Sequence, residues 1–272
     1  MKNKYLFTIV IANYNHGIFI EDAIKSVLNQ SFKNYELFVV DAKSTDNSVE
    51  VIKKYECKID WWVSEVDTGQ SNAFNKGFSR ANGKFLLWLN ADDILLPNSL
   101  KKAADEIEKN KSVEWFVANT ISFDVNGLIT KCVNGPSWHR FLFKNAPITV
   151  YGPTSIFSKK IFDELGCFDE SLNYCMDTDL WYRFKNAGYC FKRIHFYFWG
   201  LRVHEDSKTS HAFFGKKSTH FLEESKKIKI KNKIVFKKKN LLYQKIFKII
   251  NGNYFKSFLD TKKNMGKHIS NL

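Results

Sequence analysis

The chain has 272 residues, 44% of them hydrophobic and 26% charged, which is the balance of an ordinary globular protein with a sizeable core. No apolar run approaches the ~18 residues that a membrane-spanning helix needs, and the first residues lack the apolar core of a signal peptide, so we expect neither a spanning anchor nor secretion. The five cysteines form no Cys-x-x-Cys pair, which argues against a disulfide framework and against a zinc site.

In chain order, the first 110 residues alternate short apolar runs with segments of helical periodicity. The runs predict buried strands at residues 6–11, 37–40, 61–63 and 85–89. Helices are expected over residues 19–30, from residue 44, from residue 71 and from Pro97. This alternation predicts an α/β fold with β-α-β units and a parallel sheet. Further along, Asn126-Gly127 predicts a hairpin within residues 115–133, and helices are expected over residues 158–165 and 177–187.

Polar side chains stand at three of the predicted strand ends. They are Asn13 with Asn15, then Asp41, and then Asp92 with Asp93. Ligands bind parallel sheets at the carboxyl ends of the strands. Two adjacent carboxylates repel each other unless a cation or a donor lies between them, and such oxygen ligands suit Mg²⁺ or Mn²⁺ shared with substrate phosphates. The sequence has neither a dinucleotide-binding nor a P-loop glycine motif, so a carboxylate-held metal is the expected means of neutralising phosphate.

Three later residues are candidates for chemistry or for structure. Asp177 stands where a helix begins and is a candidate general base, whereas Asp179 is expected to be a helix cap. His204 follows another apolar run and is a candidate metal ligand, although a single histidine is more often structural.

Seven segments, in this order, resemble the family 2 glycosyltransferases with the GT-A fold, between about residues 6 and 209. The segments are residues 9–15, 39–46, 64–77, 89–93, 166–172, 176–181 and 202–208. The resemblance implies a Rossmann-like, mostly parallel sheet flanked by helices. It also implies an inverting, metal-dependent enzyme that moves a sugar from a nucleotide-diphosphate sugar to a glycan or lipid-linked acceptor, as in the synthesis of surface polysaccharides.

The same resemblance implies a role for each residue of the motifs. Asp41 would accept a hydrogen bond from the nucleobase, Asp92 would face the ribose, and Asp177 would deprotonate the acceptor hydroxyl. The implied donor site holds Ala12, Asn13, Asn15, Asp41, Gln70, Asn75 and Asp92, and the implied Mn²⁺ or Mg²⁺ site holds Asp93 and His204. The chain departs from the usual pattern at Ala42-Lys43, at Asn90 and at Met176.

The positive charge of the chain is concentrated at its C-terminal end. Residues 212–272 hold 16 lysines against three acidic residues, with apolar residues at helical spacing between them. We therefore expect a catalytic domain over residues 1–211, with a nucleotide-sugar half (1–110) and an acceptor half (111–211), and a basic amphipathic helical tail over residues 212–272. Such a tail favours peripheral binding to an anionic membrane, on its cytoplasmic face; the alternative is a helical cap on the catalytic domain.

Two other functions are compatible with parts of the sequence. A nucleotidyltransferase that forms nucleotide-sugars would need basic residues after the first strand, but residues 12–17 contain neither Arg nor Lys. A non-catalytic basic binding protein would leave the carboxylates at the strand ends unexplained. The tail has no arginine, and we therefore expect no nucleic-acid partner.

Overall fold

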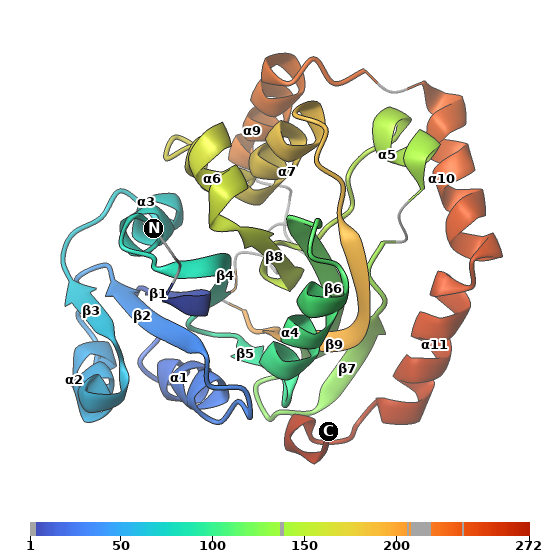
Figure 1. The fold of residues 1–272 in the computed structure, drawn as a ribbon. Helices are drawn as coiled ribbons and strands as arrows, with labels where there is room; N and C mark the ends of the chain where they lie inside the picture. Colours follow the sequence, from blue (N-terminus) through green and yellow to red (C-terminus); the bar gives the residue numbers. More distant parts are fainter. Residues whose placement is uncertain (1–3, 137–138, 206, 208–218, 236) are drawn as a thin grey trace.

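The structure is a computed structural model that describes residues 4–136, 139–205, 207, 219–235 and 237–272 (Figure 1). One sheet runs through the molecule in the strand order β3-β2-β1-β4-β8-β6-β9-β5, and β7 lies off this path and pairs with β6. The strands are β1 (Tyr5–Asn13), β2 (Tyr35–Asp41), β3 (Trp61–Ser64), β4 (Gly83–Asn90), β5 (Ile94–Leu95), β6 (Trp115–Phe123), β7 (Ile129–Val133), β8 (Ser155–Ser158) and β9 (Lys192–Arg202).

The sheet has a parallel half and a mixed half. Strands β3, β2, β1 and β4 are all parallel, as their apolar runs predict. Strand β8 pairs antiparallel with both β4 and β6, while β6 and β9 are parallel. The expected α/β sheet flanked by helices is thus confirmed, and the antiparallel pairs belong to the second half of the chain.

Helices cover both faces of the sheet because alternate residues of a strand point to opposite sides. On β1, Ile9 and Ile11 belong to the core beneath α1, α2 and α4, whereas Val10 belongs to the core beneath α3, α6 and α7. The helices are α1 (Ile20–Leu28), α2 (Ser48–Lys54), α3 (Gln70–Ser79), α4 (Ser99–Lys109), α5 (Arg140–Asn145), α6 (Lys159–Leu165) and α7 (Met176–Asn186).

The C-terminal segment forms three helices, α9 (Thr219–Lys231), α10 (Lys238–Ile250) and α11 (Asn253–Asn264). In Figure 1, α9 lies beside α7, and α10 and α11 run down one side of the molecule past α5 and β7. The expected helical extension is confirmed, while the domain boundary predicted at residue 211 lies outside the described residues and stays a prediction. No helix in the described part of the chain has the length and apolar content to cross a bilayer.

Candidate active site

The carboxyl ends of β1, β2 and β4 lie side by side. In the strand register, Asn13 is paired with Asp41, and Ala12 is paired with both Val40 and Asn90. The polar residues predicted at the strand ends therefore share one edge of the sheet, where a ligand of an open α/β sheet binds.

Asp41 is fully buried and organises this edge. One carboxylate oxygen accepts hydrogen bonds from Asn13 Nδ2 (2.6 Å) and Ser44 Oγ (2.5 Å). The other accepts from the backbone N–H of Ser44 (3.0 Å) and from Ser64 Oγ (2.6 Å). Asn13 Oδ1 is buried and has no hydrogen-bond partner within the described residues. The amide oxygen of Asn13 is thus an acceptor at this edge of the sheet that no described residue satisfies.

The loops after β1 and β2 are tied to each other. Asn15 has a left-handed backbone (φ 53°), and its Oδ1 accepts a hydrogen bond from the backbone N–H of Thr45 (2.8 Å). Lys43 is also left-handed (φ 54°), a conformation that favours glycine. This turn is therefore held by a lysine in a backbone conformation that a glycine adopts with less strain.

The structure pairs His204 with Asp92 rather than with the expected Asp93. Asp92 Oδ2 lies 3.0 Å from His204 Nε2, and the two side chains remain 13% and 8% exposed. Asp93 is 1% exposed and points inward, where its carboxylate accepts from the backbone N–H of Arg202 (3.0 Å) and from Asn90 Nδ2 (3.0 Å). Burial, reinforced by the neighbouring Asp92 charge, raises the pKa of Asp93 well above its ordinary value.

Arg202 fixes the backbone that carries this pair. Its guanidinium lies between the rings of Phe19 (4.8 Å) and Phe123 (4.7 Å), donates to the carbonyl of Asp92 (2.9 Å) and forms an ion pair with Asp22 (2.8 Å). Sequence reasoning named Arg202 only as part of a motif, because its partners lie far away in the chain.

Asp92 and His204 could be two ligands of a divalent ion that takes its remaining ligands from outside the protein. Neighbouring ligands of an octahedral ion, each about 2.1 Å from it, are about 3 Å apart, which matches the separation of the carboxylate oxygen and the ring nitrogen. The described residues contain no group of three or more His, Cys, Asp and Glu side chains that would hold a metal by themselves. This pair therefore suits Mg²⁺ or Mn²⁺ whose other ligands come from water and a diphosphate.

Asp177 lies in the first turn of α7, beside strand β4. A Cβ built on Gly152 would come within 2.7 Å of the Trp88 ring and 3.1 Å of Asp177 Oδ2, so glycine is what lets Asp177 approach β4. Asp177 Oδ1 accepts from the backbone N–H of Thr178 (2.6 Å), and burial raises the pKa of Asp177 to about 6. A carboxylate with this pKa can accept a proton near neutral pH.

The remaining expected donor residues have different surroundings. Gln70 donates a hydrogen bond to Asn90 Oδ1 at the end of β4, and the neighbouring Ser71 hydroxyl contacts the Met176 sulfur (3.2 Å), so α3 and α7 begin side by side at this edge. The side-chain amide of Asn75 instead bonds to the backbone of Phe168 and to Glu170, each at 2.9 Å. Gln70 therefore faces the candidate site, whereas Asn75 fastens the loop after α6 to α3.

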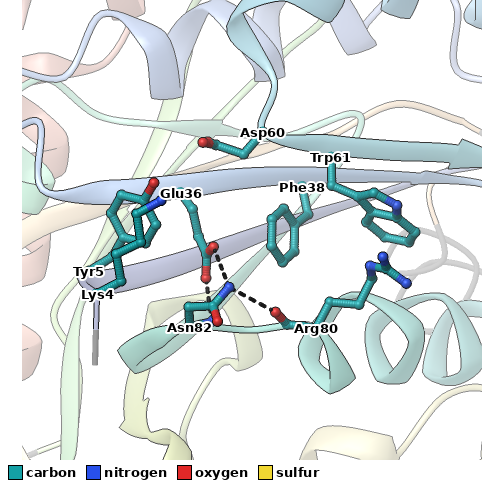
Figure 2. Close-up of a pocket in the computed structure, with 8 residues that line it drawn as sticks. All are labelled: Lys4, Tyr5, Glu36, Phe38, Asp60, Trp61, Arg80 and Asn82. Carbon is teal, nitrogen blue, oxygen red and sulfur yellow. Dashed lines mark hydrogen bonds between the residues drawn. The ribbon is translucent and has the colours of Figure 1, made fainter. Parts of the chain in front are cut away.

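A cavity of about 450 Å³ opens at the opposite end of the parallel strands (Figure 2). Glu36, near the start of β2, accepts there from the Thr8 hydroxyl and from the backbone of Asn82, and the Arg80 guanidinium lies 4.7 Å from the Trp61 ring. Because it is at the amino ends of the strands, this cavity is separate from the candidate site.

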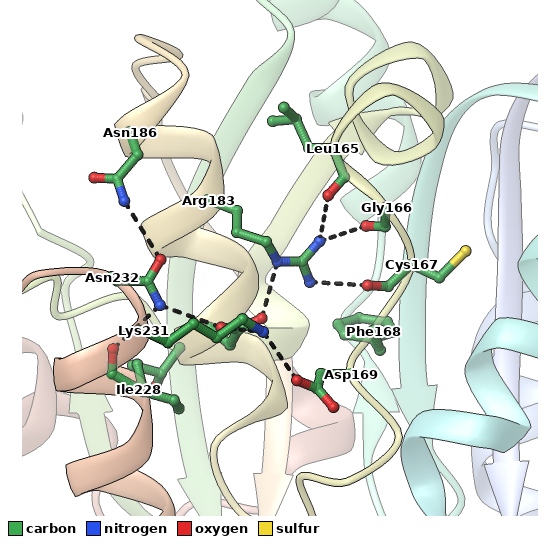
Figure 3. Close-up of polar contacts among 12 residues, drawn as sticks. Leu165, Gly166, Cys167, Phe168, Asp169, Arg183, Asn186, Ile228, Lys231 and Asn232 are labelled. Carbon is green, nitrogen blue, oxygen red and sulfur yellow. Dashed lines mark hydrogen bonds and ion pairs between the residues drawn. The ribbon is translucent and has the colours of Figure 1, made fainter.

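Asp179 is structural, but it is not the expected helix cap. It is fully buried and forms ion pairs with Arg183 of its own helix (2.8 Å) and with Lys231 of α9 (3.1 Å). Figure 3 shows these two cations, Arg183 on α7 and Lys231 on α9. Lys231 also reaches Asp169 (2.9 Å), and this hydrogen-bonded ion pair lowers the pKa of Asp169 to about 2. Two segments far apart in the chain, α7 and α9, are held together at this point.

Glu224 is a buried residue of α9 that sequence reasoning did not single out. Its carboxylate accepts three backbone N–H groups, from Asn173 (2.8 Å), Tyr174 (2.8 Å) and Cys175 (3.0 Å). These residues lead directly into the turn that carries Asp177. Glutamates on lysine-rich helices are common, and no sequence signal separated this one from its neighbour Glu223.

The profile of the family described as "Glycosyl transferase family 2" matches residues 8–166, more than half of the chain. The chain belongs to glycosyl transferase family 2. The match includes Asp41 and Asp92 but ends before Asp177 and His204.

Two relatives illustrate the family. The chain is 30% identical over 187 residues to an uncharacterized glycosyltransferase of Rickettsia prowazekii, an alignment that covers 66% of this chain and 58% of the relative. It is 29% identical over 150 residues to a Bacillus subtilis protein named as a candidate teichuronic acid biosynthesis glycosyltransferase, TuaG, covering 54% and 56% of the two chains. The chain thus spans somewhat over half the length of these relatives.

Two solved structures share the fold of this family 2 chain. The Staphylococcus aureus protein TarS (residues 1–349), solved with UDP-GlcNAc, has a TM-score of 0.63 at 19% identity, covering 82% of this chain and 65% of TarS. A mannosyltransferase of Pyrobaculum calidifontis, solved with GDP-Man and Mn²⁺, has a TM-score of 0.61 at 16% identity, covering 82% and 63%. At these identities the likeness establishes the fold.

Proposed function

We propose that this chain transfers a sugar, with inversion at the anomeric carbon, from a nucleotide-diphosphate sugar to a hydroxyl of a glycan or lipid-linked acceptor. The observation that carries the proposal is the placing of two different carboxylates around β4. Asp92 follows the strand and faces His204, while Asp177 lies beside the strand and has a pKa raised to about 6. The name of the B. subtilis relative supports a role in the synthesis of surface polysaccharides.

The donor would lie at the carboxyl edge of β1, β2 and β4. Ala12, Asn13 and Asn15 would line the nucleoside, with Asp41 holding the loop that shapes its pocket and the free Asn13 Oδ1 accepting a base or ribose donor group. Gln70 would face the diphosphate and sugar side, next to Asn90. The nucleotide-sugars in the two solved relatives support this class of donor.

Asp92 and His204 would hold the divalent ion, Mn²⁺ or Mg²⁺. Asp93 would keep this segment in position through its hydrogen bonds with Asn90 and with the backbone of Arg202. The ion, when bound, stabilises the negative charge that develops on the leaving diphosphate. This proposal gives Asp92 the ligand role that the sequence motif assigned to Asp93.

Asp177 would take the proton of the acceptor hydroxyl as that oxygen attacks the anomeric carbon. The attack comes from the face opposite the leaving diphosphate, and the carbon is therefore inverted. The base must be ionised before the attack, and a pKa of about 6 leaves most Asp177 side chains ionised at neutral pH.

The chain would work on the cytoplasmic face of a membrane. Its lysine-rich C-terminal segment supports attachment to anionic lipid, and a lipid-linked acceptor would be found at that surface.

A donor screen tests the proposed activity. The purified full chain is incubated with a panel of UDP-, GDP- and dTDP-sugars, with Mn²⁺ or with a chelator, and nucleoside diphosphate release is measured. We expect release from one donor class that the chelator abolishes. No release from any donor, with or without a glycan acceptor, would contradict the proposal.

A further inference from the structure

Helix α11 has its polar side toward the protein and its apolar side toward solvent. Its partly buried residues are Asn253, Ser257, Asp260, Thr261 and Asn264, which are all polar. Its exposed residues include Tyr254, Phe255, Phe258 and Leu259, with exposed fractions between 45% and 66%. This is the reverse of an ordinary surface helix, which buries its apolar side.

The inward polar side has a structural cause. Among the described strands, β7 pairs only with β6, and its other edge presents backbone groups that need partners. Thr261 Oγ1 accepts the backbone N–H of Cys132 (2.9 Å), Ser257 Oγ accepts that of Asn134 (3.0 Å), and Asp260 accepts from the Tyr197 hydroxyl. The fold therefore explains the polar side of α11, whereas no described residue covers its aromatic side.

Helix α10 continues this surface. Asn240 and Gln244 face inward, where they donate to the carbonyls of Asn145 (3.0 Å) and Pro147 (2.8 Å). Its exposed apolar residues are Leu241, Leu242, Tyr243, Ile246, Ile249 and Ile250. The two helices contact each other and run in line along one side of the molecule (Figure 1). We call the outer sides of α10 and α11, with their lysines, the outer helical face.

The charge of this region indicates what kind of surface fits it. Residues 237–272 hold nine lysines, all exposed except Lys248, and one acidic residue, Asp260, which is partly buried and accepts a hydrogen bond from the Tyr197 hydroxyl. Two copies of the chain joined through this face would bring these lysines together, and like charges in contact are unfavourable. An anionic lipid surface instead pairs with the lysines while accepting the exposed rings.

We propose that the outer helical face lies in the interface of an anionic bilayer, with the rings of Tyr254, Phe255 and Phe258 among the acyl chains and the lysines at the head groups. The inference rests on the membrane attachment proposed above and names the surface that makes it. Helix α9 is also rich in lysine, but its inner side is not part of this surface. Glu224 and Lys231 on that side contact the rest of the protein.

The experiment is sedimentation of the full chain with phosphatidylcholine vesicles, with and without phosphatidylglycerol, at low and high salt. Two variants alter the outer helical face, F255S/F258S and K262E/K263E. Two matched controls make the same kinds of change elsewhere: V125S replaces an exposed apolar residue of the β6–β7 turn, and K53E/K54E reverses an exposed lysine pair of α2.

We expect the unaltered chain and both controls to sediment only with anionic vesicles and to be released by salt. Each outer-face variant should lower the partition coefficient at least about tenfold, with unchanged thermal unfolding.

If outer-face variants and controls bind alike, the named surface is wrong while membrane attachment stands. If the unaltered chain never sediments, both are wrong. If it dimerises without lipid and F255S/F258S abolishes the dimer, the face is a self-association surface and the inference is also wrong. Nucleoside diphosphate release from a soluble donor tests the proposed activity separately.

Discussion

Glu224 accepts a hydrogen bond from the backbone N–H of Cys175, two residues before Asp177. The same carboxylate also accepts from Asn173 and Tyr174, and it is buried at this position. Hydrogen bonds to an ionised acceptor are stronger than neutral ones. A C-terminal helix of this family 2 chain therefore sets the position of the turn that carries the proposed base.

Replacing Glu224 by glutamine tests this positioning role. The amide keeps the size of the side chain, but one of the two acceptor oxygens becomes an NH₂ group, which cannot accept the backbone N–H groups that this oxygen accepted. We expect kcat to fall roughly ten- to hundredfold, because small misplacements of a catalytic group are costly, while the KM for the donor changes little. Glu223→Gln, on the exposed neighbour, is the matched control. Equal kcat values for Glu224→Gln and the unaltered chain would refute the role.

The rate should depend on pH through Asp177. Burial raises the pKa of this carboxyl to about 6, and the base acts only when ionised. The activity is therefore expected to be lost as the pH falls through about 6, with kcat dropping about tenfold per pH unit below that value. Initial rates between pH 4.5 and 8, on protein whose fold is checked by circular dichroism at each pH, measure this. A flat profile across this range would exclude Asp177 as the base.

Metal-dependent nucleotide binding should depend on Asp92 and His204. Calorimetry with Mn²⁺ and the nucleoside diphosphate of the active donor is expected to show at least about a tenfold loss of affinity in Asp92→Asn and in His204→Ala, since each removes one of two protein ligands. Metal-free binding should stay unchanged. Asp105→Asn, on a partly exposed residue of α4, is the control. Undiminished metal-dependent affinity in both variants would place the ion elsewhere.

Breaking the Asp179 network should destabilise the protein. Asp179 is fully buried and Arg183 is 17% exposed, so Asp179→Ala leaves the largely buried Arg183 guanidinium without its carboxylate, at a cost of roughly 3–5 kcal/mol in the free energy of unfolding. Asp163 forms a similar pair with Lys159 one turn away, but its side chain is 55% exposed, and Asp163→Ala is expected to cost below about 1 kcal/mol. Urea unfolding of the two variants measures this difference, and equal midpoints would show that the buried ion pair contributes no more to stability than the exposed one.

The parallel half of the fold could be predicted because its signals are local. Strands β1, β2 and β4 are continuous apolar runs. Strands β1 and β2 end at the marked residues Asn13 and Asp41, and β4 ends two residues before Asp92. Strand β8 has four residues and lies between β4 and β6 only through tertiary pairing, so no local pattern indicates it.

The finer parts of the site depend on contacts between distant residues. Asp92 and Asp93 are chemically identical neighbours, and the one that turns inward is chosen by the backbone of Arg202, more than a hundred residues later. The same holds for the tail. Its lysines and apolar residues predict one amphipathic element, but α9 packs on the domain through a buried glutamate, and only the contacts of each helix show which of its sides faces solvent.

The most direct measurement of the central claim compares nucleoside diphosphate release by the unaltered chain and by Asp177→Asn, with the active donor and acceptor, while donor affinity is measured in parallel. The amide keeps the size of the side chain but cannot take a proton. We expect the rate to fall by about two to four orders of magnitude while donor affinity stays within about threefold. Turnover by Asp177→Asn at the rate of the unaltered chain would contradict the assignment of Asp177 as the base of an inverting transfer.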